Sequence, residues 1–316
     1  MNHVGIMGGA GFIGRHFVAE LLRQDKTVSV FDNFCSGTPE HLAEFDQNPK
    51  LRIHRVDIED TEKLIELSKN IDAVIHLASN PDIAKAASEP RIDFVQGTVL
   101  TESVAEVCRL NRVPTILYAS GSGVYGDKGE TILNENSPLS PISTYGASKL
   151  AGEALLESYS YMFGMRCLAF RFANVVGPFQ THGVGYDFLR RLKSDPTRLM
   201  ILGNGLQKKS YVYVTDIVNG VLLAEKKHTT GFDVFNISTP DSITVNEIAT
   251  SAMEALEIDP SDVAITYSGG DRGWKADVPV VRLSAHKLLS LGWNPQFNSV
   301  ESIRQSLRAM NSQLEV

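Results

Sequence analysis

The sequence has few cysteines, and they are not arranged to bind a metal. Cys35, Cys108 and Cys167 are far apart in a chain of 316 residues and form no C-x-x-C pair. This spacing argues against a structural zinc site and against a disulfide framework. We expect free thiols in a reducing cytoplasm and no metal centre.

Long apolar runs and excess positive charge are also missing. No run approaches the ~20 apolar residues that cross a bilayer, and the N-terminal "MNHVGIMGGAG" leads straight into a strand pattern, so we expect no signal peptide. The formal charge of −7 argues against a nucleic-acid-binding surface, which needs clustered basic residues. We therefore expect a soluble globular protein without membrane or nucleic-acid partners.

Short apolar runs and longer amphipathic stretches alternate through the first half of the chain. The apolar runs predict strands at residues 3–8, 27–32, 51–57, 73–79, 115–121 and 166–174. The amphipathic stretches predict helices at residues 11–25, 61–71, 95–111 and 146–164. This alternation is typical of an α/β fold, and we expect a doubly wound parallel Rossmann sheet with helices on both faces.

The alternation weakens beyond Asn174, where Gly, Pro and His interrupt the chain. The further elements predicted are strands at 199–205, 209–216 and 232–238 and a helix at 216–227. The last helix and strand fit a return to the first sheet. We expect a Rossmann domain at 1–174, with 213–237 rejoining it, and a smaller C-terminal α/β substrate lobe at 175–212 and 238–316.

Three glycines mark the turn between the first predicted strand and helix. Gly8, Gly11 and Gly14 would let the backbone approach a pyrophosphate at the helix N-terminus. Asp32 ends the second predicted strand, where a carboxylate accepts hydrogen bonds from the adenine-ribose hydroxyls. No arginine stands beside it, so the pattern favours NAD over NADP. The alternative is that Asp32 only caps the following loop.

The glycine spacing G-x-x-G-x-x-G, together with "VDIED" and "VIHLAS", resembles the extended short-chain dehydrogenase/reductase family, which includes NAD-dependent nucleotide-sugar epimerases and dehydratases. One departure is "FVQGT", which lacks the Asn that this family often has there and so removes one expected cofactor contact. The resemblance implies NAD contacts at Gly8, Gly11, Phe12, Ile13, Gly14, Asp32, Asn33, Phe34, Ser36, Gly37, Asp57, Ile58, Leu77, Ala78, Ser79, Tyr145, Lys149 and Phe172.

"TYGASK" supplies a candidate catalytic pair. Tyr145 and Lys149 are four positions apart, which places both side chains on one face of a helix. The Lys149 ammonium would lower the pKa of Tyr145 from about 10 toward neutrality and let it take a proton from a sugar hydroxyl. In the resembled family these residues are the base and its activator. The alternative is a surface helix pair without a role in catalysis.

"YASGSGVYGD" departs from the resembled family at the expected catalytic hydroxyl. Counting back from "VYG", the family's Ser or Thr position falls on Gly121, between Ser120 and Ser122. We expect Ser122 to hydrogen-bond the reacting oxygen, with Ser120 as the second candidate. The alternative is that both serines only satisfy backbone groups in a tight turn.

The same stretch bears on the reaction type. Where dehydratases of the resembled family carry Asp and Glu, this chain has Ser122 and Gly123. Expelling a hydroxyl group needs a general acid, and no carboxylate is available for it here. Dehydration is therefore disfavoured relative to epimerisation.

Three residues of the second half resemble the family's nucleotide-sugar contacts. They are Asn174 in "RFANVVGP", Lys209 in "QKKSYVYV" and Arg272 in "GGDRGW". Lys209 stands where the family has Arg, so it can neutralise a diphosphate but cannot grip it with two parallel hydrogen bonds. Ser210 replaces the Asp that follows. The alternative for each cation is a solvated surface charge.

These patterns together lead us to expect an NAD-dependent epimerase acting on a nucleotide-diphosphate sugar, at C4 of a UDP-sugar, through a 4-keto intermediate. A 4,6-dehydratase, a 4-keto-sugar reductase and a catalytically silent NAD-binding scaffold are the alternatives. A homodimer through the helices at 95–111 and 146–164 is also expected, although packing within one chain would explain their apolar content equally well.

Overall fold

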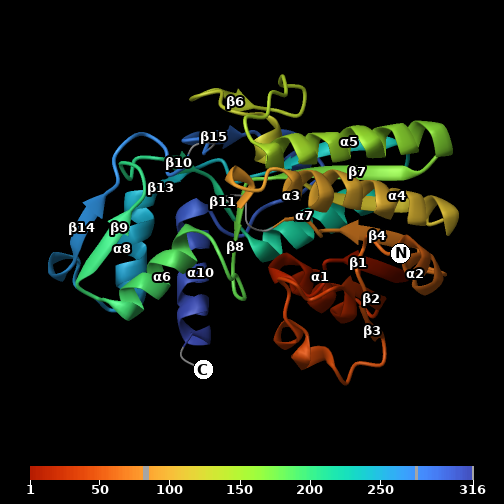
Figure 1. Ribbon diagram of the computed structural model, residues 1–316, viewed down its shortest axis with the longest axis horizontal. Helices are drawn as coiled ribbons and strands as arrows, with labels where there is room; N and C mark the ends of the chain where they lie inside the picture. The colour runs from red at the N-terminus through yellow and green to blue at the C-terminus, as the bar shows by residue number, and fades with distance from the viewer. Residues whose placement is uncertain (81–84, 275–276, 315–316) are drawn as a thin grey trace. The chain divides into compact units, whose positions relative to one another are not determined.

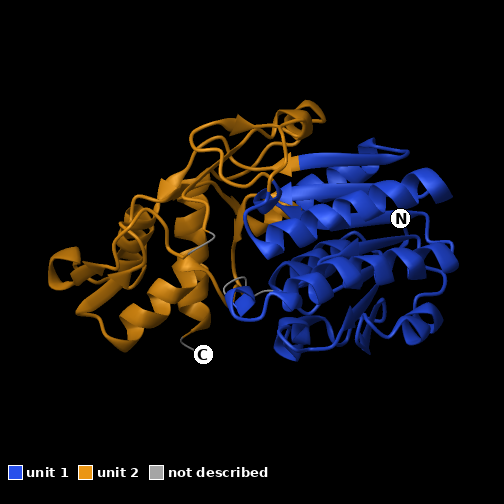
Figure 2. Ribbon diagram, turned by 45° about the horizontal axis from the view of Figure 1, so that its top comes forward, with its two compact units in different colours: residues 1–124, 141–171, 218–235 blue, residues 125–140, 172–217, 236–316 orange. Residues whose placement is uncertain are grey.

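The computed structural model describes residues 1–80, 85–274 and 277–314 (Figure 1). The chain divides into two compact units, drawn in different colours in Figure 2. Unit 1 consists of Met1–Val124, Pro141–Arg171 and Val218–Phe235. Unit 2 consists of Tyr125–Ser140, Phe172–Ile217 and Asn236–Val316.

A seven-stranded sheet in the order β12-β7-β5-β4-β1-β2-β3 confirms the predicted α/β fold. The pairs from β3 through β2, β1 and β4 to β5 are parallel. Its strands are β1 (His3–Met7), β2 (Thr27–Asp32), β3 (Leu51–Arg55), β4 (Ala73–His76), β5 (Thr115–Gly121), β7 (Arg166–Phe172) and β12 (Phe232–Ile237). The chain order reverses between β1 and β4, and ligands of such sheets bind at the carboxyl ends of the strands beside that reversal.

Helices cover both faces of this sheet because its strands are apolar on both sides. α2 (Thr61–Leu67), α4 (Leu100–Leu110) and α5 (Thr144–Phe163) share one buried apolar cluster with the strands, including Leu64, Val104 and Leu156. α1 (Phe12–Arg23) contacts β1 and β2 without contributing to that cluster, so it lies on the other face.

α5 carries the two candidate catalytic residues, and its ends are set by local sequence. Ser143 caps its start, since its side chain accepts a hydrogen bond from the backbone N–H of Gly146. Gly164 ends it with φ 69°, a left-handed conformation that favours glycine. The helix predicted at 95–111 starts differently, with α3 (Arg91–Asp93) and a π-helical segment, η4 (Phe94–Val99), before α4.

Unit 2 has its own apolar core, formed by α6 (Val184–Ser194), α8 (Val245–Ala255) and α10 (Ser299–Gln313) with short strands. The strand predicted at 209–216 is divided at Ser210, whose hydroxyl donates to the Asp241 carbonyl. The short strands are β6 (Ile132–Leu133), β8 (Asn174–Val176), β9 (Arg198–Ile201), β10 (Lys208–Lys209), β11 (Tyr211–Tyr213), β13 (Ile243–Thr244), β14 (Ala264–Tyr267) and β15 (Val280–Leu283).

The remaining helices of the chain are α7 (Val214–Lys227) and α9 (His286–Ser290). Its 3-10 turns are η1 (Pro39–His41), η2 (Ala43–Phe45), η3 (Lys85–Ala87) and η5 (Ser122–Val124) in unit 1 and η6 (Pro260–Asp262) in unit 2.

The compact units differ from the expected domains mainly at residues 125–140, and by a few residues at 172–174, 213–217 and 236–237. Residues 125–140, expected in the Rossmann domain, belong to unit 2. The reason is a buried contact, because the Tyr125 hydroxyl donates to the Asn236 side chain at 2.8 Å and to the Asn134 carbonyl at 3.0 Å. In the part of the chain that the structure describes, no helix has the length and apolarity that crossing a bilayer needs.

Candidate active site

The glycine-rich turn between β1 and α1 is shaped by close backbone contacts. Gly8 has φ 82°, and a Cβ there would lie 2.9 Å from the Ala78 nitrogen. A Cβ on Gly14 would lie 2.5 Å from the Gly8 carbonyl oxygen, so only glycine lets α1 pack this close to the turn. Gly11 caps α1 without a side-chain hydrogen bond. The first-turn N–H groups, those of Phe12 and Ile13 among them, therefore remain available to an anion.

Asp32 links this turn to the loop after β2. One carboxylate oxygen accepts from the Ala10 N–H at 2.9 Å and the other from the Phe34 N–H at 2.8 Å. The loop-capping contact that was the alternative is thus present, yet each carboxylate oxygen keeps a further lone pair for a ligand hydroxyl. Burial raises the pKa of Asp32.

The other residues expected near the adenosine lie in the same neighbourhood. A Cβ on Gly37 would lie 2.8 Å from the Ala10 carbonyl carbon, so this loop packs closely on the glycine turn. The Asn33 amide donates to Asp57 at 3.0 Å. Ser36 is exposed and Ile58 is buried.

The loop after β4 returns to the strand beside it. The N–H groups of Leu77 and Ala78 both donate to the Met7 carbonyl, at 2.9 and 3.0 Å. The Ser79 side chain is hydrogen-bonded to the side chain of Tyr145. Phe172, the last residue of β7, belongs to unit 2 by sequence range.

Tyr145 and Lys149 lie in the first two turns of α5 and face each other. The Lys149 ammonium nitrogen lies 5.5 Å from the centre of the Tyr145 ring and donates to the Ala119 carbonyl at 2.8 Å. Lys149 is only 2% exposed. This arrangement is not that of a surface helix pair, because a solvated lysine would extend into water.

The acidities of these two groups correct one expectation. The pKa of Tyr145 is raised to about 12, mainly by burial. The charge of Asp93 also raises it, whereas the hydrogen bond with the Ser79 side chain lowers it. Burial also lowers the pKa of Lys149 to about 8, opposed by the charges of Asp93 and Glu153. The expected fall of the Tyr145 pKa toward neutrality is therefore wrong for this state of the protein, because desolvation of the phenolate outweighs its attraction to Lys149.

The two serines beside Gly121 differ in their surroundings. The Ser120 hydroxyl is buried and donates to Glu153 at 2.5 Å, and Glu153 is itself paired with Arg171 at 2.7 Å. Ser122 is partly buried at the start of η5, and its side chain makes no hydrogen bond to any residue in the described ranges. The surroundings therefore favour Ser122 over Ser120 as the hydroxyl free to meet a ligand.

Gly121 leaves room for a side chain. A Cβ at this position would meet no heavy atom of the described residues within 4 Å. The described structure therefore has space at position 121 for the Ser or Thr that the family usually carries there.

The candidate substrate-binding cations in unit 2 are both paired with carboxylates that sequence reasoning missed. Lys209 contacts the Asp277 carboxylate at 2.5 Å. Arg272 contacts the Asp127 carboxylate at 2.6 Å and donates to the Asp277 carbonyl at 2.6 Å. Asp277 thus brings the two cations together. Asn174 begins β8, and its amide donates to the Ser210 carbonyl at 3.3 Å.

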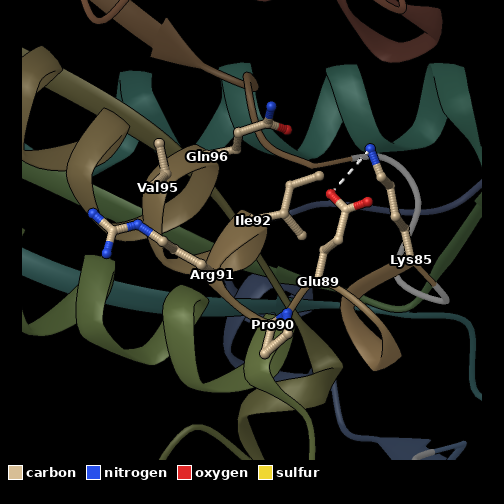
Figure 3. A pocket seen from close by; sticks show the side chains of 7 residues that line it. All are labelled: Lys85, Glu89, Pro90, Arg91, Ile92, Val95 and Gln96. Carbon is tan, nitrogen blue, oxygen red and sulfur yellow. Dashed lines mark ion pairs between the residues drawn. The ribbon is translucent and has the colours of Figure 1, made fainter.

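A hollow of about 520 Å³ opens beside η3 and α3 of unit 1 (Figure 3). Lys85 and Glu89 form an ion pair at 3.4 Å across it, and Arg91 points away from that pair. None of the candidate catalytic residues lines this hollow; its lining residues are Lys85, Glu89, Pro90, Arg91, Ile92, Val95 and Gln96.

Comparison with known proteins decides the family. Residues 4–238 match the model of the NAD dependent epimerase/dehydratase family. The chain belongs to that family. This confirms the resemblance that the glycine spacing indicated.

Relatives align with this member of the family over nearly its whole length. A putative UDP-glucose 4-epimerase of Methanocaldococcus jannaschii is 29% identical, over 97% of this chain and 98% of its own. A crystal structure of a UDP-galactose 4-epimerase has a TM-score of 0.88 at 36% identity and 99% coverage of both chains. The UDP-glucose 4-epimerase of Thermus thermophilus in complex with NAD has a TM-score of 0.86 at 29% identity, covering 97% of this chain and 98% of that one.

The residues present fit NAD as the cofactor of this family member. The turn at Gly8, Gly11 and Gly14 keeps side chains away from the start of α1, where uncapped helix N–H groups would face the pyrophosphate. Asp32 retains acceptor capacity for ribose hydroxyls. The chain is accordingly an NAD-dependent enzyme of this family. The relatives named above are UDP-sugar 4-epimerases, and a dTDP-glucose 4,6-dehydratase from Streptomyces venezuelae also aligns with it, with a TM-score of 0.87 at 25% identity over 97% of this chain and 96% of that one.

Proposed function

We propose that the protein interconverts two nucleotide-diphosphate sugars that differ in the configuration at C4, and that its substrate is a UDP-sugar. The observation that carries this proposal is the pair of Tyr145 and buried Lys149 on one face of α5, in the same unit as the glycine turn and Asp32. The relatives named 4-epimerases support the choice of C4. The product would differ from the substrate in one stereocentre, with no net redox change.

In the proposed mechanism Tyr145 takes the proton of the C4 hydroxyl. Lys149 stabilises the resulting phenolate, and Ser122 donates a hydrogen bond to the reacting oxygen. NAD, when bound, supplies a hydride acceptor with a positive charge in its oxidised form. The 4-keto sugar then turns in the site. The hydride taken from C4 would return to the opposite face of that carbon as Tyr145 gives the proton back to the C4 oxygen, which yields the other epimer.

The raised pKa of Tyr145 sets a requirement on this mechanism. With a pKa of about 12, very little of Tyr145 is ionised near pH 7. Additional positive potential is needed beside the phenol before it acts as a base, and Lys149 provides part of it. Tyr145 therefore resists ionisation until bound ligands add positive potential beside it.

We propose that Asn174, Lys209 and Arg272 bind the nucleotide diphosphate. Both cations already have carboxylate partners, Asp277 and Asp127, that fix their side chains. A diphosphate offers more negative charge than one carboxylate, so it can replace or share these contacts. This ion-pair exchange is the expected route of substrate binding.

The alternatives are weaker for specific reasons. A 4,6-dehydratase would need a carboxylate where Ser122 and Gly123 stand. A reductase that uses NADPH would be disfavoured because Asp32 repels the 2′-phosphate. A catalytically silent scaffold is suggested only by Gly121. The buried contact of Tyr145 with Lys149 argues against it, because this pair could still act as a base and its activator.

We also propose a cytoplasmic homodimer. Large apolar side chains stand exposed at the ends of α4 and α5, where water would disfavour them unless another surface covers them. These are Leu110, Tyr161, Met162 and Phe163. Sedimentation of the purified protein at several concentrations would test the dimer.

Incubation of the purified protein with NAD and a panel of nucleotide sugars tests the activity. Epimer exchange followed by ¹H NMR is expected for a UDP-sugar. A new methyl signal would instead indicate a 4-keto-6-deoxy product and hence a dehydratase. Binding of NAD without conversion of any sugar would favour the silent scaffold.

A further inference from the structure

Asp93 is a buried carboxylate beside the candidate catalytic pair that the proposed mechanism does not use. It ends α3, next to the start of α5 (Figure 1), and is only 1% exposed. One of its oxygens accepts from the Asn80 amide at 2.8 Å, and the other accepts from the Thr144 hydroxyl at 2.7 Å. A carboxylate this deep is stable as an anion only when such donors and a cation compensate its lost hydration.

The two donors flank Tyr145 from two different segments. Thr144 is the first residue of α5 and directly precedes Tyr145. Asn80 directly follows Ser79, whose side chain is hydrogen-bonded to Tyr145. Asp93 therefore ties together the loop after β4 and the helix start that between them place the Tyr145 side chain.

The segment after Asp93 is rigidly packed, so this tie is well anchored. A Cβ on Gly97 of η4 would lie 2.5 Å from the Ser148 hydroxyl oxygen, which leaves no space between η4 and α5. The Ser148 hydroxyl in turn donates to the Tyr145 carbonyl at 2.8 Å. π-Helical turns of this kind are often found at functional sites.

The charges around Lys149 assign Asp93 a second role. Two carboxylates act on Lys149, those of Asp93 and Glu153. Glu153 is already paired with Arg171 through both of its oxygens, at 3.0 and 2.7 Å. Among the described residues Asp93 accepts from the neutral groups of Asn80 and Thr144, and its charge has the larger effect of the two that raise the pKa of Lys149, so Asp93 is the counter-charge of that ammonium.

We propose that Asp93 is a positioning residue for Tyr145 and Lys149: it fixes the first turn of α5 through Thr144, and it is the buried counter-charge that keeps Lys149 protonated. This inference rests on the proposed function only in taking Tyr145 and Lys149 as the base and its activator. The ties and the charge balance exist in the folded protein whatever its substrate.

The groups that face the pair determine what loss of this charge would do. They are Asp93 from α3, Glu153 from α5, His76 from β4 and Tyr118 from β5. Burial lowers the pKa of His76 to about 3 and raises that of Tyr118, so both stay neutral across the accessible range. Removing the Asp93 charge should therefore lower the pKa of Lys149 and of Tyr145 together.

The test is Asp93→Asn, which keeps the size of the side chain and removes its charge. Lys149 is followed by NMR in protein labelled with ¹³C-lysine, and its signal is assigned by its loss in Lys149→Met. We expect the Lys149 titration to move from near 8 to lower pH by about one unit. Thr144→Val is the matched control, since it breaks one tie but keeps the charge and should leave the titration in place.

A Lys149 titration that stays at the same pH in Asp93→Asn would overturn the proposal. Should Asp93→Asn not fold, the same shift is expected in Asp93→Ser, which leaves a smaller polar side chain in the same space. In the activity assay, both Asp93→Asn and Thr144→Val should lose about tenfold in kcat, but only Asp93→Asn should shift the pH profile to lower pH. A Lys149 shift in a protein that epimerises no sugar would refute the proposed function and leave this inference standing.

Discussion

Two ion pairs, one from each unit, differ in how far they are exposed to water. In unit 1 the Arg171–Glu153 pair is buried, with side chains 4% and 5% exposed. In unit 2 the Arg272–Asp127 pair has side chains 32% and 30% exposed. A buried ion pair cannot change partners without leaving one charge unpaired and unhydrated. A half-exposed pair can change partners, because water solvates the charges during the exchange. The Arg171–Glu153 pair is thus a fixed part of unit 1, whereas the Arg272–Asp127 pair of unit 2 is exposed enough to change partners.

The largest effect expected on the unit 1 side is on catalysis. Tyr145→Phe removes the proposed base and keeps the ring, so turnover should fall by about 10³-fold or more. Bound NAD, measured after protein precipitation, should be unchanged because the glycine turn is intact. Epimer exchange at the wild-type rate would defeat the mechanism.

Breaking the buried pair should cost the most stability. Glu153→Gln leaves Arg171 buried without a counter-charge, and the free energy of unfolding should fall by about 3–5 kcal/mol in urea titrations. Glu106→Gln is the matched control, because Glu106 forms a more exposed pair with Arg109 and should cost less than about 1 kcal/mol. Equal losses in the two variants would contradict the distinction between buried and exposed pairs.

The burial of Lys149 should make the free energy of unfolding depend on pH in mild alkali. Its pKa is about 8 in the folded protein and 10.5 as the ordinary value, so between these values the unfolded chain binds more protons. Stability contributed at this site should therefore rise with pH from about 8 to 10.5, by on the order of 1–3 kcal/mol. Urea unfolding of the wild type and Lys149→Met across this window should show the rise in the wild type alone.

The two serines beside Gly121 should respond in opposite ways. Ser122→Ala should lower turnover by about tenfold with little change in stability. Ser120→Ala should cost about 1 kcal/mol of stability, since Glu153 loses one buried donor, and should affect turnover less. Gly121→Ser should fold normally and restore turnover to Ser122→Ala. Failure of this rescue, with Ser122→Ala fully active, would transfer the role to another donor.

The exposed pair in unit 2 should matter little to stability. Asp127→Asn should change the free energy of unfolding by less than about 1 kcal/mol. It should nevertheless alter substrate binding, because Arg272 loses its competing carboxylate. We expect a lower KM for the nucleotide sugar, whereas Arg272→Ala should raise KM; initial-rate kinetics distinguish the two.

The sequence predicted the sheet and its helices well because their signals are local. The apolar run at 73–79 indicates a strand, and the glycine-rich stretch at Gly8 indicates a turn between strand and helix. Both patterns can be recognised within a few residues. The pairing of Tyr145 with Lys149 was also predictable, since helical spacing alone brings the two side chains to one face.

The parts that escaped prediction depend on contacts between distant segments. Asp93 meets Asn80 and Thr144 only after folding, and neither its neighbours in sequence nor its spacing indicate this. The acidity of Tyr145 was predicted in the wrong direction for the same reason, because the cost of burying it comes from the whole surrounding unit. The grouping of residues 125–140 with unit 2 likewise depends on distant residues, through the Tyr125–Asn236 hydrogen bond and the pairing of β6 with β15.

The contact between Gly123 and Gly146 has a practical consequence for anyone who alters this enzyme. A Cβ on Gly146 would lie 2.5 Å from the Gly123 carbonyl oxygen, so the loop of Ser122 and the helix of Tyr145 pack together without room for a side chain between them. Mutant libraries aimed at new sugars should hold these two glycines constant and diversify Gly121 instead. A Cβ at Gly121 meets no heavy atom of the described residues within 4 Å, so a new side chain there should leave the supporting backbone undisturbed.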